Sequence, residues 1–313
     1  MDTTQKNIEE IVKKAYPKRY EYFANRIQQK DLHHAYILYG ATGAGHHTVA
    51  TWLASQCIDT SIVPFGNESI VHSDLVILQS SGKAISIEQI RSVQMHLSSK
   101  PSIAKWKVAV ILTAETMTEQ AANALLKIVE EPPQHSIIIL ATSSIDQIVP
   151  PLISRCQKMY IPPIAHNTAS TIIREYKQGA TVEKMIHMAD GGVDNIVKLL
   201  YNEKEYLDQE SQIDFWSRFL HSSTSERRIM VNDRYLKAKN SKEQVHTINA
   251  VLDVLSRLLQ EKLTEQHASA AHTIPNYTVK QVYARLRLVE RIRSMSAQNV
   301  NKKSIFEYLI TGI

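Results

Sequence analysis

The stretch from Gly40 to Thr48 has the spacing of a phosphate-binding loop. Gly40 and Gly45 are five positions apart, with Gly43 between them, as in the pattern G-x-x-x-x-G-K-[ST]. In that pattern the glycines let backbone N–H groups surround phosphate oxygens. The lysine neutralises the phosphate charge, and the hydroxyl residue binds Mg²⁺.

The side chains that perform this chemistry are missing. His46 and His47 stand where the lysine and the hydroxyl residue belong, and Thr48 comes one position late. An imidazole is shorter than a lysine side chain and mostly neutral near pH 7. We therefore predict that the loop only connects a strand to a helix. Nucleotide binding by its backbone N–H groups alone is the alternative.

The acidic residues of an ATPase are missing as well. A strand beside such a loop ends in acids that bind Mg²⁺ and position water. Leu112 and Thr113 occupy those positions, and Glu115 comes two residues later. The combined loss predicts that the chain does not hydrolyse ATP and binds no nucleotide productively.

The elements that would position these residues alternate between strands and helices. Apolar strands separated by helices indicate a parallel sheet covered on both faces, with ligand sites at the carboxyl ends of the strands. Ser86 with Gln89, and Thr116 with Glu119, have the spacing of capping boxes at helix starts. Strands are predicted at 34–40, 74–79, 107–112, 136–142 and 158–163.

The strand pattern ends at Pro163. Residues 164–205 are predicted to form a small helical unit with a turn at Gly191–Gly192, and 206–313 a second helical region with long helices around 248–263 and 282–295. The predicted fold class is therefore α/β followed by all-α.

The distribution of charge and the number of cysteines limit the classes of protein to which this sequence could belong. Residues 216–313 carry 16 Lys and Arg against 8 Asp and Glu, whereas residues 1–215 carry 20 against 23. The basic region indicates a nucleic-acid or acidic-protein partner, or else solvated helix faces. Two distant cysteines, Cys57 and Cys156, exclude a disulfide framework and fit a reducing cytoplasm. We expect no signal peptide and no membrane span.

Histidines flank the loop on both sides, but no carboxylate follows at ligand spacing in the sequence. No metal site is therefore predicted. The histidines are His33, His34, His46 and His47.

Four segments in this order resemble the AAA+ clamp-loader subunits of bacterial DNA polymerase III, and within that group the delta-prime family. They are LHHAYILYGATGAG, SIEQIRSV, MTEQAANALLKIVEEPPQHSIIILAT and PPLISRC. The ATP-hydrolysing subunits of the group keep an intact loop and carry a four-cysteine zinc module. Residues 58–83 here have no such cysteines, which favours the delta-prime type.

The resemblance implies a division into three domains and an assembly. An AAA+ ATPase-like domain with a degenerate P-loop would span 1–163, a helical lid 164–205 and a helical collar 206–313. The collar would join a hetero-oligomeric pentameric ring with gamma/tau-type ATPases and delta. The ring would load a sliding clamp on primer-template DNA in the cytoplasm, at the nucleoid-associated replication fork. ATP and Mg²⁺ would be bound at the neighbours' sites.

The resemblance also implies a functional role for one residue of this chain. Arg155 matches the family's Ser-Arg-Cys motif, and it would act in trans as an arginine finger on a neighbour's γ-phosphate. A stand-alone AAA+ NTPase motor and a DNA-binding adaptor with a basic C-terminal domain are the alternatives.

Other positions have weaker signals. Thr142 stands where the family senses γ-phosphate. Asp194 and Asn195 flank the place, within GGVDNIV (191–197), where active relatives carry a phosphate-sensing arginine, so we expect both functions to be lost. DNA contact by Lys100, Lys105 and Lys107 is a further possibility, with solvated surface charges as the alternative.

Overall fold

The chain separates into two compact units, Met1–Glu203 and Lys204–Ile313, in the computed structural model of the protein. The three-domain division expected from the sequence stays a prediction. The structure describes residues 3–59, 72–80, 84–179, 181–189, 191–236, 251–252, 254–256, 258–259, 275, 277–297 and 301–313.

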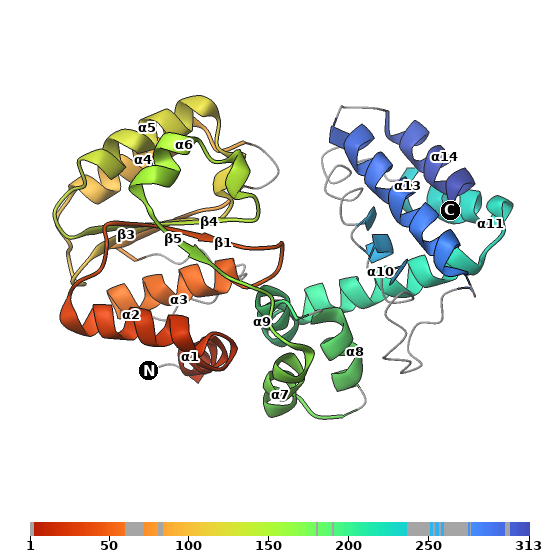
Figure 1. Cartoon of the computed structure of the whole chain (residues 1–313), viewed down its shortest axis with the longest axis horizontal. Coiled ribbons are helices and arrows are strands. Elements are labelled where there is room, and N and C mark those ends of the chain that lie inside the picture. Colours follow the sequence, from red (N-terminus) through yellow and green to blue (C-terminus); the bar gives the residue numbers. More distant parts are fainter. Residues whose placement is uncertain are drawn as a thin grey trace. The chain divides into compact units, whose positions relative to one another are not determined.

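A five-stranded parallel sheet forms the centre of the first unit (Figure 1). Its order is β2-β3-β4-β1-β5. All five predicted strands are confirmed, four of them to within one residue at either end, whereas the last ends three residues earlier than predicted, at Tyr160. β3 and β4 are buried along their whole length because helices cover both faces of the sheet. The strands are β1 (Ala35–Tyr39), β2 (Leu75–Leu78), β3 (Lys107–Ile111), β4 (Ser136–Thr142) and β5 (Gln157–Tyr160).

Two groups of helices cover the sheet, one on each face (Figure 1). The upper face in this view carries α4 (Ile87–Ser98), α5 (Glu119–Glu130) and α6 (Pro150–Arg155). The 3₁₀ turn η1 (Ala114–Thr116) connects β3 to α5, and η2 (Ile145–Gln147) connects β4 to α6. The lower face carries α1 (Thr3–Ala15), α2 (Pro17–Gln29) and α3 (His46–Ile58).

One of the two predicted capping boxes is confirmed and the other is wrong. Ser86 caps α4, and its partner Gln89 completes the reciprocal pair of hydrogen bonds. In contrast, α5 is capped by Thr118, which accepts from the backbone N–H of Ala121. Thr116 lies in η1, where its hydroxyl donates to the Thr113 carbonyl at 2.7 Å and so is committed to the preceding turn.

Three short helices follow the sheet within the first unit. They are α7 (His166–Tyr176), α8 (Thr181–Ala189) and α9 (Val193–Tyr201), and they confirm the predicted helical character of this region. Gly191 has a φ of 66° in the turn that leads into α9. This left-handed conformation favours glycine. After this turn, the start of α9 contacts the loop that precedes α3.

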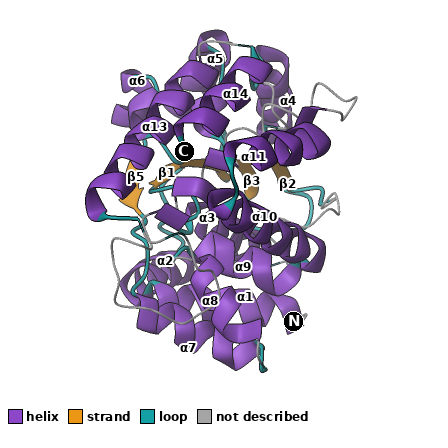
Figure 2. Cartoon of the chain, turned by 90° about the vertical axis from the view of Figure 1, so that its right-hand side faces the viewer, coloured by secondary structure: helices purple, strands orange, loops and turns teal. Residues whose placement is uncertain are grey.

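Helices alone make up the described part of the second unit, as the purple and orange colouring of Figure 2 shows. They are α10 (Glu203–His221), α11 (Thr224–Val231), the π-helical turn η3 (Asn232–Leu236), α13 (Val279–Ala297) and α14 (Lys302–Gly312). The predicted helix at 282–295 is confirmed within α13. Most of the one predicted at 248–263 lies outside the described residues. Over the described ranges, no helix combines the length and apolar character needed to cross a membrane.

Candidate functional site

The loop between β1 and α3 keeps the backbone shape of a phosphate cradle. Gly43 and Gly45 have φ angles of 78° and 140°, in the region that favours glycine. At Gly40, a Cβ atom would come within 2.2 Å of the Ile161 carbonyl oxygen. The three predicted glycines are therefore required by the geometry of this turn.

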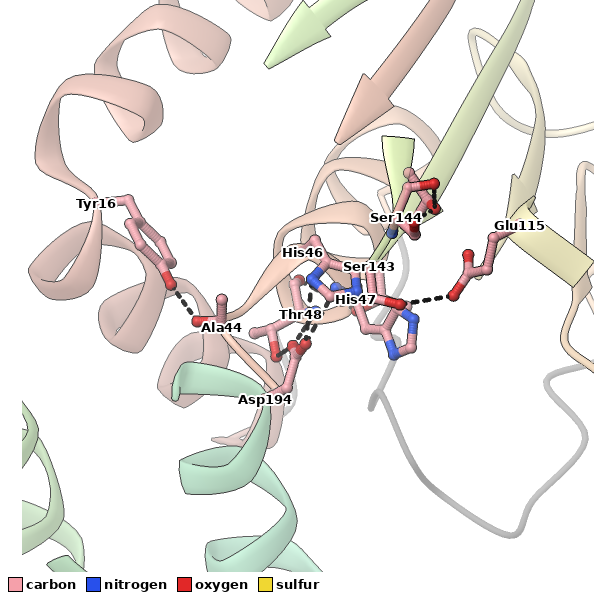
Figure 3. A network of polar contacts seen from close by, with 11 residues as sticks. Tyr16, Ala44, His46, His47, Thr48, Glu115, Ser143, Ser144 and Asp194 are labelled. Carbon is pink, nitrogen blue, oxygen red and sulfur yellow. Dashed lines mark hydrogen bonds and ion pairs between the residues drawn. The ribbon is translucent and has the colours of Figure 1, made fainter. Parts of the chain in front are cut away.

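The helix that follows the loop presents unpaired backbone N–H groups, as every helix start does, and such groups bind anions. Here the anion is the carboxylate of Asp194, from the first turn of α9 (Figure 3). Its Oδ1 accepts from the Thr48 backbone N–H at 2.8 Å and from the Thr48 hydroxyl at 2.7 Å. Its Oδ2 lies 3.4 Å from the His47 backbone nitrogen. Asp194 is 2% exposed, so the carboxylate fills a dry site.

Backbone contacts fix α9 against the same loop. The N–H groups of Val193 and Asp194 donate to the carbonyls of Ala44 and Gly43, at 2.9 Å and 3.0 Å. The Tyr16 hydroxyl, from the residue before α2, also donates to the Ala44 carbonyl (Figure 3). Burial, with the nearby Asp194 charge, raises the pKa of Tyr16, so the phenol stays a neutral donor. The loop is therefore held by hydrogen bonds from two separate segments, the start of α9 and Tyr16.

The two histidines supply no positive charge in place of the missing lysine. His46 is 2% exposed, and burial lowers its pKa to about 4, although the Asp194 carboxylate acts in the opposite direction. It is therefore neutral at pH 7. Its Nδ1 lies 3.9 Å from Asp194 Oδ2 and has no hydrogen-bond partner among the described residues. The His47 ring lies beside it, with the two ring centres 4.6 Å apart.

The positions of the missing acids have structural contacts of their own. Leu112 is buried, and its backbone N–H donates to the Leu78 carbonyl at 2.9 Å. The Thr113 hydroxyl accepts from the Ser80 backbone N–H at 2.9 Å. Glu115 accepts from the Ser143 hydroxyl at 2.9 Å, which commits one of its carboxylate oxygens.

Thr142 ends β4 next to the loop, where its carbonyl accepts from the Gly40 backbone N–H at 3.3 Å. Its hydroxyl donates to the Ser144 carbonyl at 3.2 Å and accepts from the Ser144 N–H at 3.1 Å. The hydroxyl is thereby committed to the turn after the strand.

Arg155 is the last residue of α6 and lies near the N-terminal ends of the strands, whereas the phosphate loop lies at their C-terminal ends. The strand after it, β5, starts with Gln157, which pairs with Tyr36 at the beginning of β1, whereas the phosphate loop follows the end of β1. The Arg155 side chain is 41% exposed. Its guanidinium lies 2.8 Å from Glu130 Oε1 and donates to the Pro151 carbonyl at 3.0 Å.

Lys107 fits neither of the two alternatives considered for it, DNA contact or a solvated surface charge, because it is buried. Lys107 is 3% exposed, and its ammonium donates to the carboxylate of Asp74 at 3.0 Å and to the Ser73 carbonyl. Lysine placed at the start of a central strand is buried with a partner because an unpaired charge there would be prohibitive. Lys100 and Lys105 are exposed, and their role stays untested.

Sequence reasoning missed the residue that fills the site. No carboxylate lies at ligand spacing from the histidine pair in the sequence, but α9 brings Asp194 to His46 and His47, across 147 residues of chain in the case of His47. Only the sequence GGVDNIV, with a glycine turn before an acid, hinted at a helix start pointing elsewhere. The contact of Tyr16 with the loop was missed as well.

Comparisons with known proteins agree with this fold. The profile of the family described as "DNA polymerase III, delta subunit" matches residues 15–165. The DNA polymerase III subunit delta' of Bacillus subtilis is 26% identical over 312 residues, which cover 91% of this chain and 92% of that protein. The tau subunit of the same organism is 28% identical over 199 residues, which cover 56% of this chain and 34% of that protein.

A solved structure has a similar fold. It is a gamma-subunit-related protein of DNA polymerase III from Thermotoga maritima, 20% identical, with a TM-score of 0.55 over 92% of this chain and 97% of that one. The expected resemblance is thereby confirmed. The chain is therefore similar to the clamp-loader subunits of DNA polymerase III, and it matches a delta-prime subunit along most of the length of both proteins.

Proposed function

We propose that this chain is a delta-prime-type clamp-loader subunit that does not hydrolyse ATP in its own loop. It presents Arg155 to the γ-phosphate of ATP bound, with Mg²⁺, by a neighbouring gamma/tau-type subunit. Together with delta these subunits form the ring that loads a sliding clamp on primed DNA during replication.

The state of the chain's own loop supports the first part of the proposal. A nucleotide phosphate needs the backbone N–H groups at the start of α3, and Asp194 already accepts from those of His47 and Thr48. His46 is neutral, and Leu112 and Thr113 offer no carboxylate for Mg²⁺. The same observations speak against a stand-alone motor.

The position of Arg155 supports the second part and is the observation that carries the proposal. From Tyr36, which pairs with Gln157, to Gly40 the chain runs along β1 for four residues, or roughly 13 Å at the rise of a strand. Arg155 precedes Gln157, so it lies at the edge of the sheet away from its own phosphate loop. A phosphate that it contacts therefore belongs to another molecule.

The chemistry of the guanidinium suits this task. It is always charged, and its planar fork matches two phosphate oxygens. A finger of this kind stabilises the charge that develops on the transferred phosphoryl group and is worth about 10³–10⁵ in rate. The contact with Glu130 does not prevent it, because both side chains are more than a third exposed. Ion pairs at such sites contribute about 0–1 kcal/mol.

The test is ATP turnover by the complex reconstituted with its ATPase partners, clamp and primed DNA. Arg155→Ala should leave assembly intact and sharply lower turnover at one neighbour's site, and Arg155→Lys should be nearly as damaging. Arg174→Ala is the matched control, since Arg174 is also exposed and ion-paired at a helix end, with Glu183. Turnover unchanged by both Arg155 variants would refute the finger. Turnover by the isolated chain at the rate of an ordinary AAA+ motor would refute the first part.

A further inference from the structure

Three side chains with metal-ligating atoms meet at the junction of α3 and α9. His46 and His47 are the first two residues of α3, and Asp194 is the second residue of α9. One ligand atom of each lies within 4.8 Å of the others. His46 and Asp194 are each 2% exposed, and His47 is half-buried, so the cluster lies inside the protein with one side toward its surface.

The buried nitrogen of His46 is the feature that calls for a ligand. Its Nδ1 has no hydrogen-bond partner within the described part of the chain, and it faces Asp194 Oδ2 at 3.9 Å. This separation is too long for a hydrogen bond. It fits two atoms bound to one ion, because two metal–ligand distances of about 2.0–2.2 Å allow separations up to roughly 4 Å.

The carboxylate is oriented so that one oxygen remains for an ion. Its Oδ1 accepts both short hydrogen bonds, from the backbone N–H and the hydroxyl of Thr48. Its Oδ2 has the longer 3.4 Å contact with the His47 backbone nitrogen and faces His46 Nδ1 at 3.9 Å. Hydrogen bonds of this kind to the non-ligating atom fix metal ligands in proteins. The negative charge of Asp194 also offsets the positive end of the α3 dipole, which would otherwise repel a cation.

We propose that His46, His47 and Asp194 bind one divalent transition-metal ion of the Zn²⁺ class, which ties α9 to the start of α3. Two imidazole nitrogens and one carboxylate oxygen suit Zn²⁺, Co²⁺ or Ni²⁺. Mg²⁺ requires oxygen ligands, so it is not the ion of this site. Three protein ligands leave a fourth position for water. The site is independent of the arginine finger, and its role is to hold the lid helices on the phosphate loop.

The experiment uses the full-length chain without a histidine tag, freed of metal by a chelator. Titration with ZnCl₂ is followed by calorimetry, and titration with CoCl₂ by visible d–d absorption. We expect one ion per chain, a Co²⁺ spectrum typical of nitrogen and oxygen ligands, displacement of Co²⁺ by Zn²⁺, and no competition from MgCl₂. Added Zn²⁺ should also raise the unfolding temperature.

Variants locate the ion. His46→Ala and Asp194→Asn should each weaken Zn²⁺ binding by about 10-fold or more. His33→Ala should bind normally. It is a matched control because His33 and His34 are also adjacent, with rings stacked at 4.3 Å and hydrogen bonds to the Ala35 and Val129 carbonyls.

Three results would overturn the proposal. The first is a wild-type chain that shows neither d–d absorption with Co²⁺ nor a heat of binding with Zn²⁺. The second is unchanged binding of the metal by His46→Ala, and the third is an equal loss of binding in His33→Ala. Circular dichroism in chelator confirms that each variant is folded, and the wild-type spectrum is decisive even if a variant unfolds.

Discussion

Replacing Asp194 by alanine tests how the phosphate loop is filled. The change removes two hydrogen bonds from Thr48 to the carboxylate, of 2.8 Å and 2.7 Å, and the negative charge at the start of α3. A hydrogen bond to a charged group contributes about 1.5–3 kcal/mol, and a buried charge at a helix end adds up to about 2 kcal/mol. Because water will enter and satisfy part of the loss, we expect the first unit to lose about 2–4 kcal/mol.

The same variant should regain stability from an inorganic anion. The N–H groups that Asp194 leaves unpaired fit a phosphate or sulfate oxygen. A ligand present at about 100 times its Kd stabilises the folded state by about 2.7 kcal/mol. Phosphate should therefore restore most of the loss in Asp194→Ala and hardly affect the wild-type chain, whose donors are already paired.

Amide hydrogen exchange of the α3 peptide, in the presence of a chelator, measures the local free energy of opening of this helix with and without phosphate. The measurement does not require the two units to unfold together. Asp146→Ala, at an exposed acid in η2, is the control and should change stability by less than about 0.5 kcal/mol. A loss in Asp194→Ala no larger than that of the control, or equal stabilisation of variant and wild type by phosphate, would refute the assignment of Asp194 as the resident anion.

The remaining predictions concern buried and ion-paired groups. Lys107→Met should cost about 2–4 kcal/mol in urea unfolding, because it leaves the buried Asp74 carboxylate without its cation. Burial alone would raise the pKa of Asp74, but the backbone N–H groups of 102–104 and the Lys107 ammonium lower it below its ordinary value. Its stabilising contribution is therefore complete above about pH 4 and is lost as the pH falls further, and Asp74→Asn should flatten acid unfolding curves in this range. Tyr16→Phe should cost about 1 kcal/mol and accelerate hydrogen exchange in the loop, since the Ala44 carbonyl loses one of its two donors and keeps only the Val193 N–H. Glu130→Gln should leave the ATP turnover of a reconstituted complex within about 3-fold of wild type, because its exposed pair with Arg155 is weak. A larger fall would mean that Glu130 positions the arginine.

Local signals in the sequence were enough to predict the sheet and the helices around it. The β-branched run KVAVIL and the strand SIIILAT agree with β3 and β4 because a parallel strand buried on both faces must be apolar throughout. The failure at Thr116 is also local. Two threonines compete to cap the same helix, and the turn at η1 commits the first of them to the Thr113 carbonyl.

Of the site, the sequence predicts only which catalytic side chains are missing. Missing side chains are visible in a sequence, so the loss of lysine, hydroxyl and acids was predictable. The residue that replaces the phosphate was not, because its place depends on how α9 docks, and no periodicity or spacing encodes a contact between Thr48 and Asp194. The start of α2 at Pro17, which places the Tyr16 hydroxyl on the loop, was missed for the same reason.

Arg155 lies near the start of β1, whereas the phosphate loop follows its end, so the two ends of the sheet differ in the groups that they present to neighbouring molecules. In an assembly where each shared active site combines the loop of one subunit with the arginine of the next, most members supply an arginine to one neighbour and accept an arginine from the other. Under the proposed role of Arg155, this chain would supply an arginine to one neighbour, but its own loop would hold no nucleotide phosphate for the arginine of the other neighbour to stabilise. A series of such sites would therefore stop at this subunit, and the number of working ATP interfaces would be set by where it is inserted.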